Sequence, residues 1–119
     1  MTALNLFRNE QHAQSFAAGQ TIFEAGAPGD LMYVVQEGEV EIVLAGRAID
    51  VAGPGGVIGE MALISDKPRS ASAVAKTNCR LVPIDEKRFA FLVQQTPYFA
   101  IQVMRVMAER LRRYMEAVA

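Results

Sequence analysis

The residues best suited to chemistry lie close together, in the run GPGGVIGEMALISDKPRSA over residues 53–71. This run contains a glycine, Gly59, that lets the backbone turn and approach another group closely. Residues 60–64 can form one helical turn, and the free N–H groups at the start of a helix favour an anion. Arg69 follows a proline, and its planar guanidinium can grip two phosphate oxygens. The segment therefore offers several donors to an anion.

The acid in this segment needs a separate explanation, because Glu60 beside an anion would be repulsive. A carboxylate fits there if it accepts a hydrogen bond from a sugar hydroxyl. Ala62 is small enough for a phosphate to lie against the backbone, and Ser70 adds a hydroxyl donor. Acid, amides and arginine together predict a site for a ribose fused to a cyclic phosphate. The alternative is that the glycines form turns and that Glu60 and Arg69 are a solvated pair.

The sequences GEMALI (59–64) and PRSA (68–71) resemble the phosphate-binding cassette of the cyclic nucleotide-binding domain family. That family includes the catabolite activator protein, protein kinase A regulatory subunits and cyclic-nucleotide-gated channels. Residues 16–38 resemble its first strands and glycine turns, so the likeness covers nearly the whole chain. It implies that Glu60 accepts from the ribose 2′-hydroxyl and that Arg69 pairs with the exocyclic phosphate oxygens. The other cassette contacts that it implies are at Gly59, Met61, Ala62, Ser70 and Ala71.

Recognition of the base falls to the end of the chain. The catabolite activator protein reads adenine with a Thr–Ser pair, and the matching positions here are Tyr114 and Met115, so base recognition must differ. Arg110 matches an arginine that in related domains faces the ribose acid or caps the base. Its alternative role is that of a solvated arginine at a helix C-terminus, as we expect for Arg112 and Arg113. Tyr114 either stacks on the base or packs in an apolar seam. The resemblance implies that the ligand is cAMP or cGMP, and we expect no cofactor.

The middle of the chain predicts a β domain over residues 19–84. Short runs lie between glycines, several alternate apolar and polar residues, and Ala45-Gly46 fits a tight hairpin turn. The spacing favours a sandwich or barrel over a looser α+β fold, and the resemblance implies an eight-stranded jelly-roll β-barrel with flanking helices. The strands are expected at Thr21–Phe23, Leu31–Gln36, Val40–Leu44, Ala48–Ala52, Ser72–Ala75 and Cys79–Ile84.

Helices are expected at both ends of the chain. Residues 1–18 predict a short N-terminal helical segment, and residues 85–119 two C-terminal helices. Asp85 is the N-cap of the first, over 86–95, and Pro97 begins the long second one. Its two apolar stripes predict that it covers two surfaces, namely its own β domain and either a second copy or a ligand. These stripes are Ala100, Met104, Met107, Leu111, Tyr114 and Val118, and beside them Phe99, Val103 and Val106.

Composition excludes several classes of function. The 119 residues predict one domain, and a net charge of -1 argues against nucleic acid as the main partner. We expect no membrane span, no signal peptide and, since the chain ends at Ala119, no DNA-binding domain. Cys79 is the single cysteine, so no internal disulfide can form. His12 is the single histidine, so we expect no multi-histidine metal site and no nucleophile paired with a histidine. The expected setting is the cytoplasm.

The sequence therefore predicts a non-enzymatic regulatory sensor. It binds a cyclic nucleotide and signals through movement of its C-terminal helix. The alternative is an interaction or dimerisation module with a vestigial pocket, in which the same helix contacts a partner protein or forms a homodimer.

Overall fold

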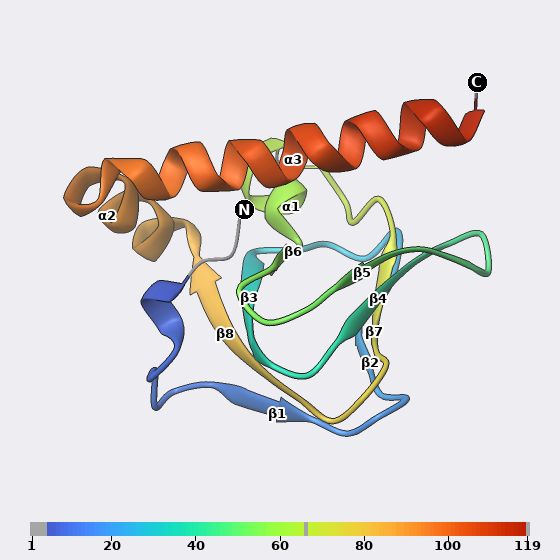
Figure 1. Cartoon of the computed structure of the whole chain (residues 1–119), viewed down its shortest axis with the longest axis horizontal. Helices are drawn as coiled ribbons and strands as arrows, with labels where there is room; N and C mark the ends of the chain where they lie inside the picture. Colours follow the sequence, from blue (N-terminus) through green and yellow to red (C-terminus); the bar gives the residue numbers. More distant parts are fainter. Residues whose placement is uncertain (1–4, 66, 119) are drawn as a thin grey trace.

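Two four-stranded antiparallel sheets lie below a long helix (Figure 1). The computed structural model describes residues 5–65 and 67–118. The strand orders are β1-β8-β3-β6 and β2-β7-β4-β5. The strands are β1 (Gln14–Phe16), β2 (Thr21–Phe23), β3 (Leu31–Glu37), β4 (Val40–Leu44), β5 (Arg47–Ala52), β6 (Val57–Ile58), β7 (Ser72–Ala75) and β8 (Cys79–Asp85). The helices are a 3₁₀ turn (Asn5–Phe7), α1 (Glu60–Ser65), α2 (Glu86–Gln95) and α3 (Pro97–Val118).

The six predicted strands are confirmed to within a residue at each end. The predicted hairpin between β4 and β5 is also confirmed, because Ala45 and Gly46 have φ values of 51° and 79°. Positive φ at both central residues is what a tight two-residue hairpin requires. The alternation of β4 holds for Val40 and Ile42, which are buried, whereas Leu44 beside the turn is exposed.

The structure differs from expectation at the N-terminus, at β6 and in the closure of the barrel. Residues 14–16 form an edge strand rather than a helix, pairing with residues 79–81 of β8, and Phe16 packs edge-on against Tyr33. The predicted N-terminal helix is reduced to a 3₁₀ turn, and residues 1–4 lie outside the described residues. Two-residue β6 was not predicted, since so short a run shows no periodicity. No closed barrel forms in the described part of the chain, because the two sheets share no strand pairing. The jelly-roll winding stays a prediction.

β3 is buried on both of its faces and divides the core into two clusters. Tyr33 and Val35 lie with residues of β4 and β7 between the two sheets. Met32 and Val34 lie on the other face, where Phe99 and Val103 of α3 cover the sheet. A continuous apolar run is therefore needed in β3, as its sequence LMYVV provides. Packing on the second cluster fixes where α3 crosses the sheet.

The two C-terminal helices begin and end as predicted. The side chain of Asp85 accepts the N–H of Arg88 at 2.8 Å, which confirms it as the N-cap of α2. The inner face of α2, formed by Phe89, Leu92 and Val93, packs against the core. The stripe of Phe99, Val103 and Val106 is buried, so one of the two surfaces predicted for α3 is confirmed. None of the described helices is long and apolar enough to cross a membrane.

Removal of the Phe99 ring is expected to destabilise the fold. Phe99 is 0% exposed and packs edge-on against Phe7 and Phe89. Phe99→Ala should therefore lower the free energy of unfolding by about 3–5 kcal/mol in urea denaturation. The matched control is Phe91→Ala on α2, where the ring is 58% exposed and the loss should stay below about 1 kcal/mol. Equal losses in the two variants would show that α3 is not packed as described.

Candidate ligand site

A cavity of about 370 Å³ lies between α1, α3 and the second sheet. Its wall contains every site residue predicted from the sequence. These are Gly59, Glu60, Met61, Ala62, Arg69, Ser70, Ala71, Arg110 and Tyr114. Site residues from two distant parts of the sequence, 59–71 and 110–114, therefore meet in one place, although their role in binding stays a prediction. Asp66, within the same segment, lies outside the described residues.

Gly59 turns the chain from β6 into α1. Its φ is 77°, which residues with a side chain rarely adopt, and a Cβ there would stand 2.6 Å from Nη1 of Arg69. Only glycine lets the backbone turn here with the guanidinium against it. Glu60 and Ala62 of α1 are buried, whereas Met61 is 48% exposed at the rim of the cavity.

Arg69 is buried beneath the loop that follows β2. Its Nη1 donates to the Gly59 carbonyl at 3.0 Å and its Nη2 to the Leu31 carbonyl at 2.7 Å. Its guanidinium stacks 4.0 Å above the ring centroid of Phe23. Burial lowers the pKa of Arg69, while Tyr33, Asp30 and Glu60 act in the opposite direction. The arginine is thus held in place, and an anion beside it would offset its desolvation.

Arg69 also carries an unused donor. Its Nε is the one buried side-chain nitrogen or oxygen without a hydrogen-bond partner in the described residues. Gly29 lies directly against this edge, because a Cβ on Gly29 would overlap Nε and Cζ of Arg69. The guanidinium can therefore occupy this position only because glycine has no side chain.

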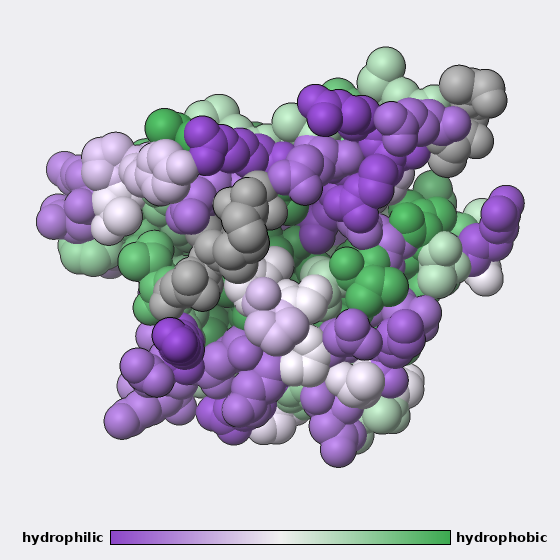
Figure 2. Space-filling view, in the orientation of Figure 1, coloured by the Kyte–Doolittle hydropathy of each residue, from purple (hydrophilic) through white to green (hydrophobic). Residues whose placement is uncertain are grey.

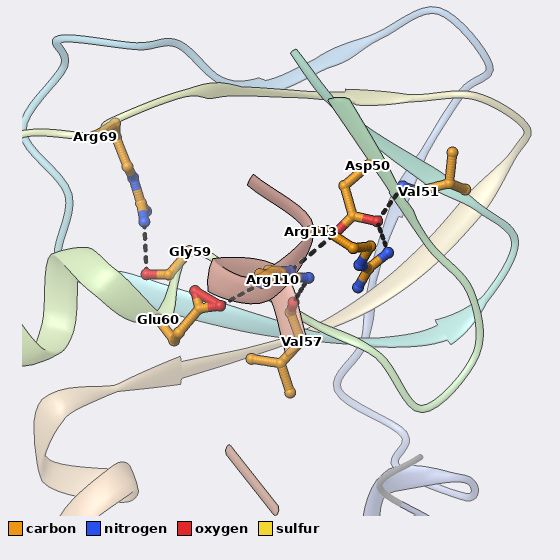
Figure 3. A network of polar contacts seen from close by, with 8 residues as sticks. All are labelled: Asp50, Val51, Val57, Gly59, Glu60, Arg69, Arg110 and Arg113. Atoms are coloured by element: carbon orange, nitrogen blue, oxygen red, sulfur yellow. Dashed lines mark hydrogen bonds and ion pairs between the residues drawn. The ribbon is translucent and has the colours of Figure 1, made fainter. Parts of the chain in front are cut away.

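An ionic network connects α1, α3 and β5 (Figure 3). Arg110 of α3 lies at its centre, and its Nη1 donates to Oε1 of Glu60. Its Nε donates to Oδ2 of Asp50 at 3.1 Å, and its Nη2 donates to the Val57 carbonyl. Glu60 is 4% and Arg69 is 7% exposed, so the interpretation of these two residues as a solvated pair is wrong. The role of Arg110 as a solvated helix-end arginine is wrong as well, because it faces the predicted ribose acid.

The expectation of a solvated role for Arg113 holds for its exposure, but the side chain also makes an ion pair. Its Nη1 donates to Oδ1 of Asp50 at 2.6 Å, although half of its side chain is exposed. Asp50, which is buried on β5, was not among the residues predicted from the sequence. Its lone position in an alternating strand, where an apolar residue would otherwise point inward, was the available signal.

The upper wall of the cavity comes from α3. Tyr114 is half-buried there, and burial raises the pKa of its hydroxyl, while Arg110 acts in the opposite direction. Met107 and Leu111 line the same wall, together with Ala108. The predicted seam thus divides, since Met107 and Tyr114 face the cavity and Met104 is 57% exposed. The side chain of Val118 lies outside the described part.

The cavity wall includes five residues that the prediction of binding residues omitted. They are Phe23, Ile42, Met107, Ala108 and Leu111. All are apolar, and nothing in their types distinguishes a residue that lines a cavity from one that fills a core. The periodicity of α3 could have placed Met107 and Leu111 on the same side as Tyr114.

The chain belongs to the cyclic nucleotide-binding domain family, whose family model matches residues 13–96. Over 105 residues it is 34% identical to a CRP-like cAMP-activated global transcriptional regulator of Mycobacterium tuberculosis. That alignment covers 82% of this chain and 46% of the regulator. Over 87 residues the chain is 41% identical to a cAMP-dependent protein kinase regulatory subunit of Aspergillus fumigatus, covering 68% of this chain and 20% of the subunit. The chain thus spans less than half the length of these relatives.

Solved structures show the same fold. The catabolite activator protein of Thermus thermophilus superposes with a TM-score of 0.76 at 30% identity, over 89% of this chain and 53% of that one. A structure described as cAMP-bound PfPKA-R gives a TM-score of 0.77 at 27% identity, over 88% of this chain and 36% of that one. The family expected from residues 59–71 is confirmed by these matches.

A double-mutant cycle between Gly29 and Arg69 tests how the arginine is held. A Cβ at position 29 must displace Arg69, so Gly29→Ala should lower the free energy of unfolding by about 1–3 kcal/mol. In an Arg69→Ala background the same change should cost close to nothing, because the obstructed side chain is absent. Gly53→Ala is the control, since a Cβ there meets nothing within 4 Å. Urea denaturation provides the energies, and an equal cost in both backgrounds contradicts the contact.

Proposed function

We propose that the chain is a regulatory module that binds cAMP or cGMP in this cavity without altering it. The observation that carries the proposal is that a buried acid, Glu60, and a buried arginine, Arg69, line the same cavity. These are the groups that a ribose hydroxyl and a cyclic phosphate require. A cytoplasmic setting is consistent with Cys79, which is buried and free.

The phosphate end of the ligand is assigned to Arg69 and the first turn of α1. An arginine has five N–H donors, and the carbonyls of Gly59 and Leu31 accept only two of those of Arg69. Donors therefore remain for phosphate oxygens. Charge-assisted bonds of this kind are roughly twice as strong as neutral ones. The backbone at 59–62 and Ser70, which is exposed in the cavity wall, supply the other contacts.

The ribose is assigned to Glu60. Its Oε1 accepts from Arg110, while Oε2 makes no hydrogen bond with the described residues. A carboxylate has about four lone-pair sites, so Glu60 can accept a 2′-hydroxyl and still hold Arg110. Recognition of the ribose and the attachment of α3 thus meet at one side chain.

The base is assigned to the apolar wall around Tyr114. The ring of Tyr114 provides a stacking surface, and Met107 and Leu111 extend it. Met115 does not line the cavity, and 61% of its surface is exposed. Stacking and apolar contact act on both adenine and guanine, so this wall supports affinity more than selectivity.

The signal is assigned to α3. This helix carries Arg110 and Tyr114, which face the proposed ribose and base, on a segment whose first half is fixed in the core by Phe99 and Val103. Binding should therefore change the position or mobility of the second half relative to the sheets.

A second candidate function, association through α3, rests on an exposed apolar stripe of that helix. Its members are spaced three or four residues apart, as in the contact face of a helical pair. Apolar side chains appear along the upper edge of α3 in Figure 2. The stripe comprises Ile101, Met104, Ala108, Leu111 and Met115, of which the four larger residues are 41–61% exposed. A vestigial pocket is disfavoured by the buried Glu60 and Arg69.

Titration with nucleotide is the first test of the proposed function. Calorimetry should detect binding of cAMP, cGMP or both, and a hundredfold excess over the dissociation constant should stabilise the fold by about 2.7 kcal/mol. Arg69→Ala should remove most of that shift. Arg112→Ala, an exposed arginine on α3, should leave it unchanged. An absence of heat with both nucleotides would reject the function, and unchanged affinity in Arg69→Ala would reject the site.

Sedimentation tests association through α3. We expect a concentration-dependent dimer that Met104→Lys weakens about tenfold or more, because a buried methionine at a helix interface would be replaced by a charge. Leu44→Lys, at the exposed end of β4 beside the hairpin turn and outside the stripe, is the control. If the wild-type chain stays monomeric, or if both variants behave alike, the stripe is not a self-association surface.

A further inference from the structure

Asp50 is a buried carboxylate outside the assigned binding residues. The residue is 9% exposed and stands on β5 opposite Ile42. Its carboxylate accepts the N–H of Val51 at 2.9 Å, Nε of Arg110 at 3.1 Å and Nη1 of Arg113 at 2.6 Å. A carboxylate removed from water is costly unless it is paired and hydrogen-bonded. Both cationic partners come from α3, three residues apart and hence on one face of the helix.

The second half of α3 has few other attachments. The apolar stripe that enters the core ends at Val106. From residue 107 to residue 116 the side chains are exposed, except for Met107, Arg110 and Tyr114. These last turns therefore depend on polar contacts for their position, and Asp50 holds them at two points.

Arg110 divides its donors among three elements. Besides Asp50 of β5, it binds Glu60 of α1 and the carbonyl of Val57 in β6 (Figure 3). A ribose hydroxyl that donates a hydrogen bond to Glu60 leaves the contact between Arg110 and Asp50 in place, because that contact uses a different nitrogen of Arg110. Asp50 thus holds α3 through a donor of Arg110 that Glu60 does not use.

We propose that Asp50 is a positioning residue for recognition of the base. It fixes the last turns of α3 through Arg110 and Arg113, and so holds Tyr114, which lies one turn after Arg110, against the base end of the cavity. Asp50 is not among the described residues that line the cavity, so it acts through the helix. This inference rests on the proposed function, because it presupposes a bound nucleotide.

The experiment is a double-mutant cycle on affinity, read by calorimetry with whichever of cAMP and cGMP binds the wild-type chain more tightly. Asp50→Asn keeps the shape and removes the charge, and should weaken binding about tenfold. In a Tyr114→Ala background the same change should cost less than about twofold, because the side chain that it positions is gone. Glu109→Gln, an exposed acid beside Arg110 on α3, is the matched control and should leave affinity unchanged.

Arg113→Gln covers the case in which Asp50→Asn does not fold. It removes one of the two contacts at a side chain that is 52% exposed, and its smaller loss of affinity should also vanish with Tyr114→Ala. A loss of equal size in both backgrounds would mean that Asp50 acts on the fold alone and would overturn the inference. Unchanged affinity in Asp50→Asn or in Arg113→Gln would overturn it as well. A wild-type chain that binds neither nucleotide rejects the proposed function itself.

Discussion

The contact between Arg110 and Glu60 joins the two parts of the molecule that form the cavity. Glu60 stands at the start of α1, in the cassette between β6 and β7, and Arg110 stands on α3, fifty residues further along the chain. Both side chains are largely removed from water, because only 5% of the Glu60 side chain and 12% of the Arg110 side chain is exposed. Each charge therefore needs the other to offset the free energy of its desolvation. The cavity therefore has a closed upper wall only while α3 lies across it.

Around this contact, the backbone provides the space that the charges occupy. Gly59 and Gly29 both lie against the guanidinium of Arg69, and neither position has room for a Cβ. The ring of Phe23 covers the flat face of the same guanidinium. These three residues thus fix the position of the arginine before any ligand enters. Such preorganisation limits the entropy lost on binding.

Local patterns in the sequence predicted most of the elements, because alternation, turn glycines and helix caps act over a few residues. Six of the eight strands, the cap at Asp85 and the start of α3 at Pro97 belong to this group. Short β1 and β6 were not predicted, since their places depend on pairing with distant strands. Asp50 was missed for the same reason, because its partners lie 60 and 63 residues away. On α3, nearly every turn carries an apolar residue, so periodicity alone did not separate the buried stripe, the cavity wall and the exposed stripe.

In the complex that we propose, a cyclic nucleotide occupies the cavity with its phosphate against the cassette and its base against α3. Amide and arginine side-chain NMR signals of the ¹⁵N-labelled chain, followed during titration with cAMP or cGMP, test this claim most directly. We expect the largest shifts at residues 59–62 and 69–71, at the Nε–H of Arg69 and around Tyr114. Shifts confined to another part of the surface, or no shifts with either nucleotide, would contradict it.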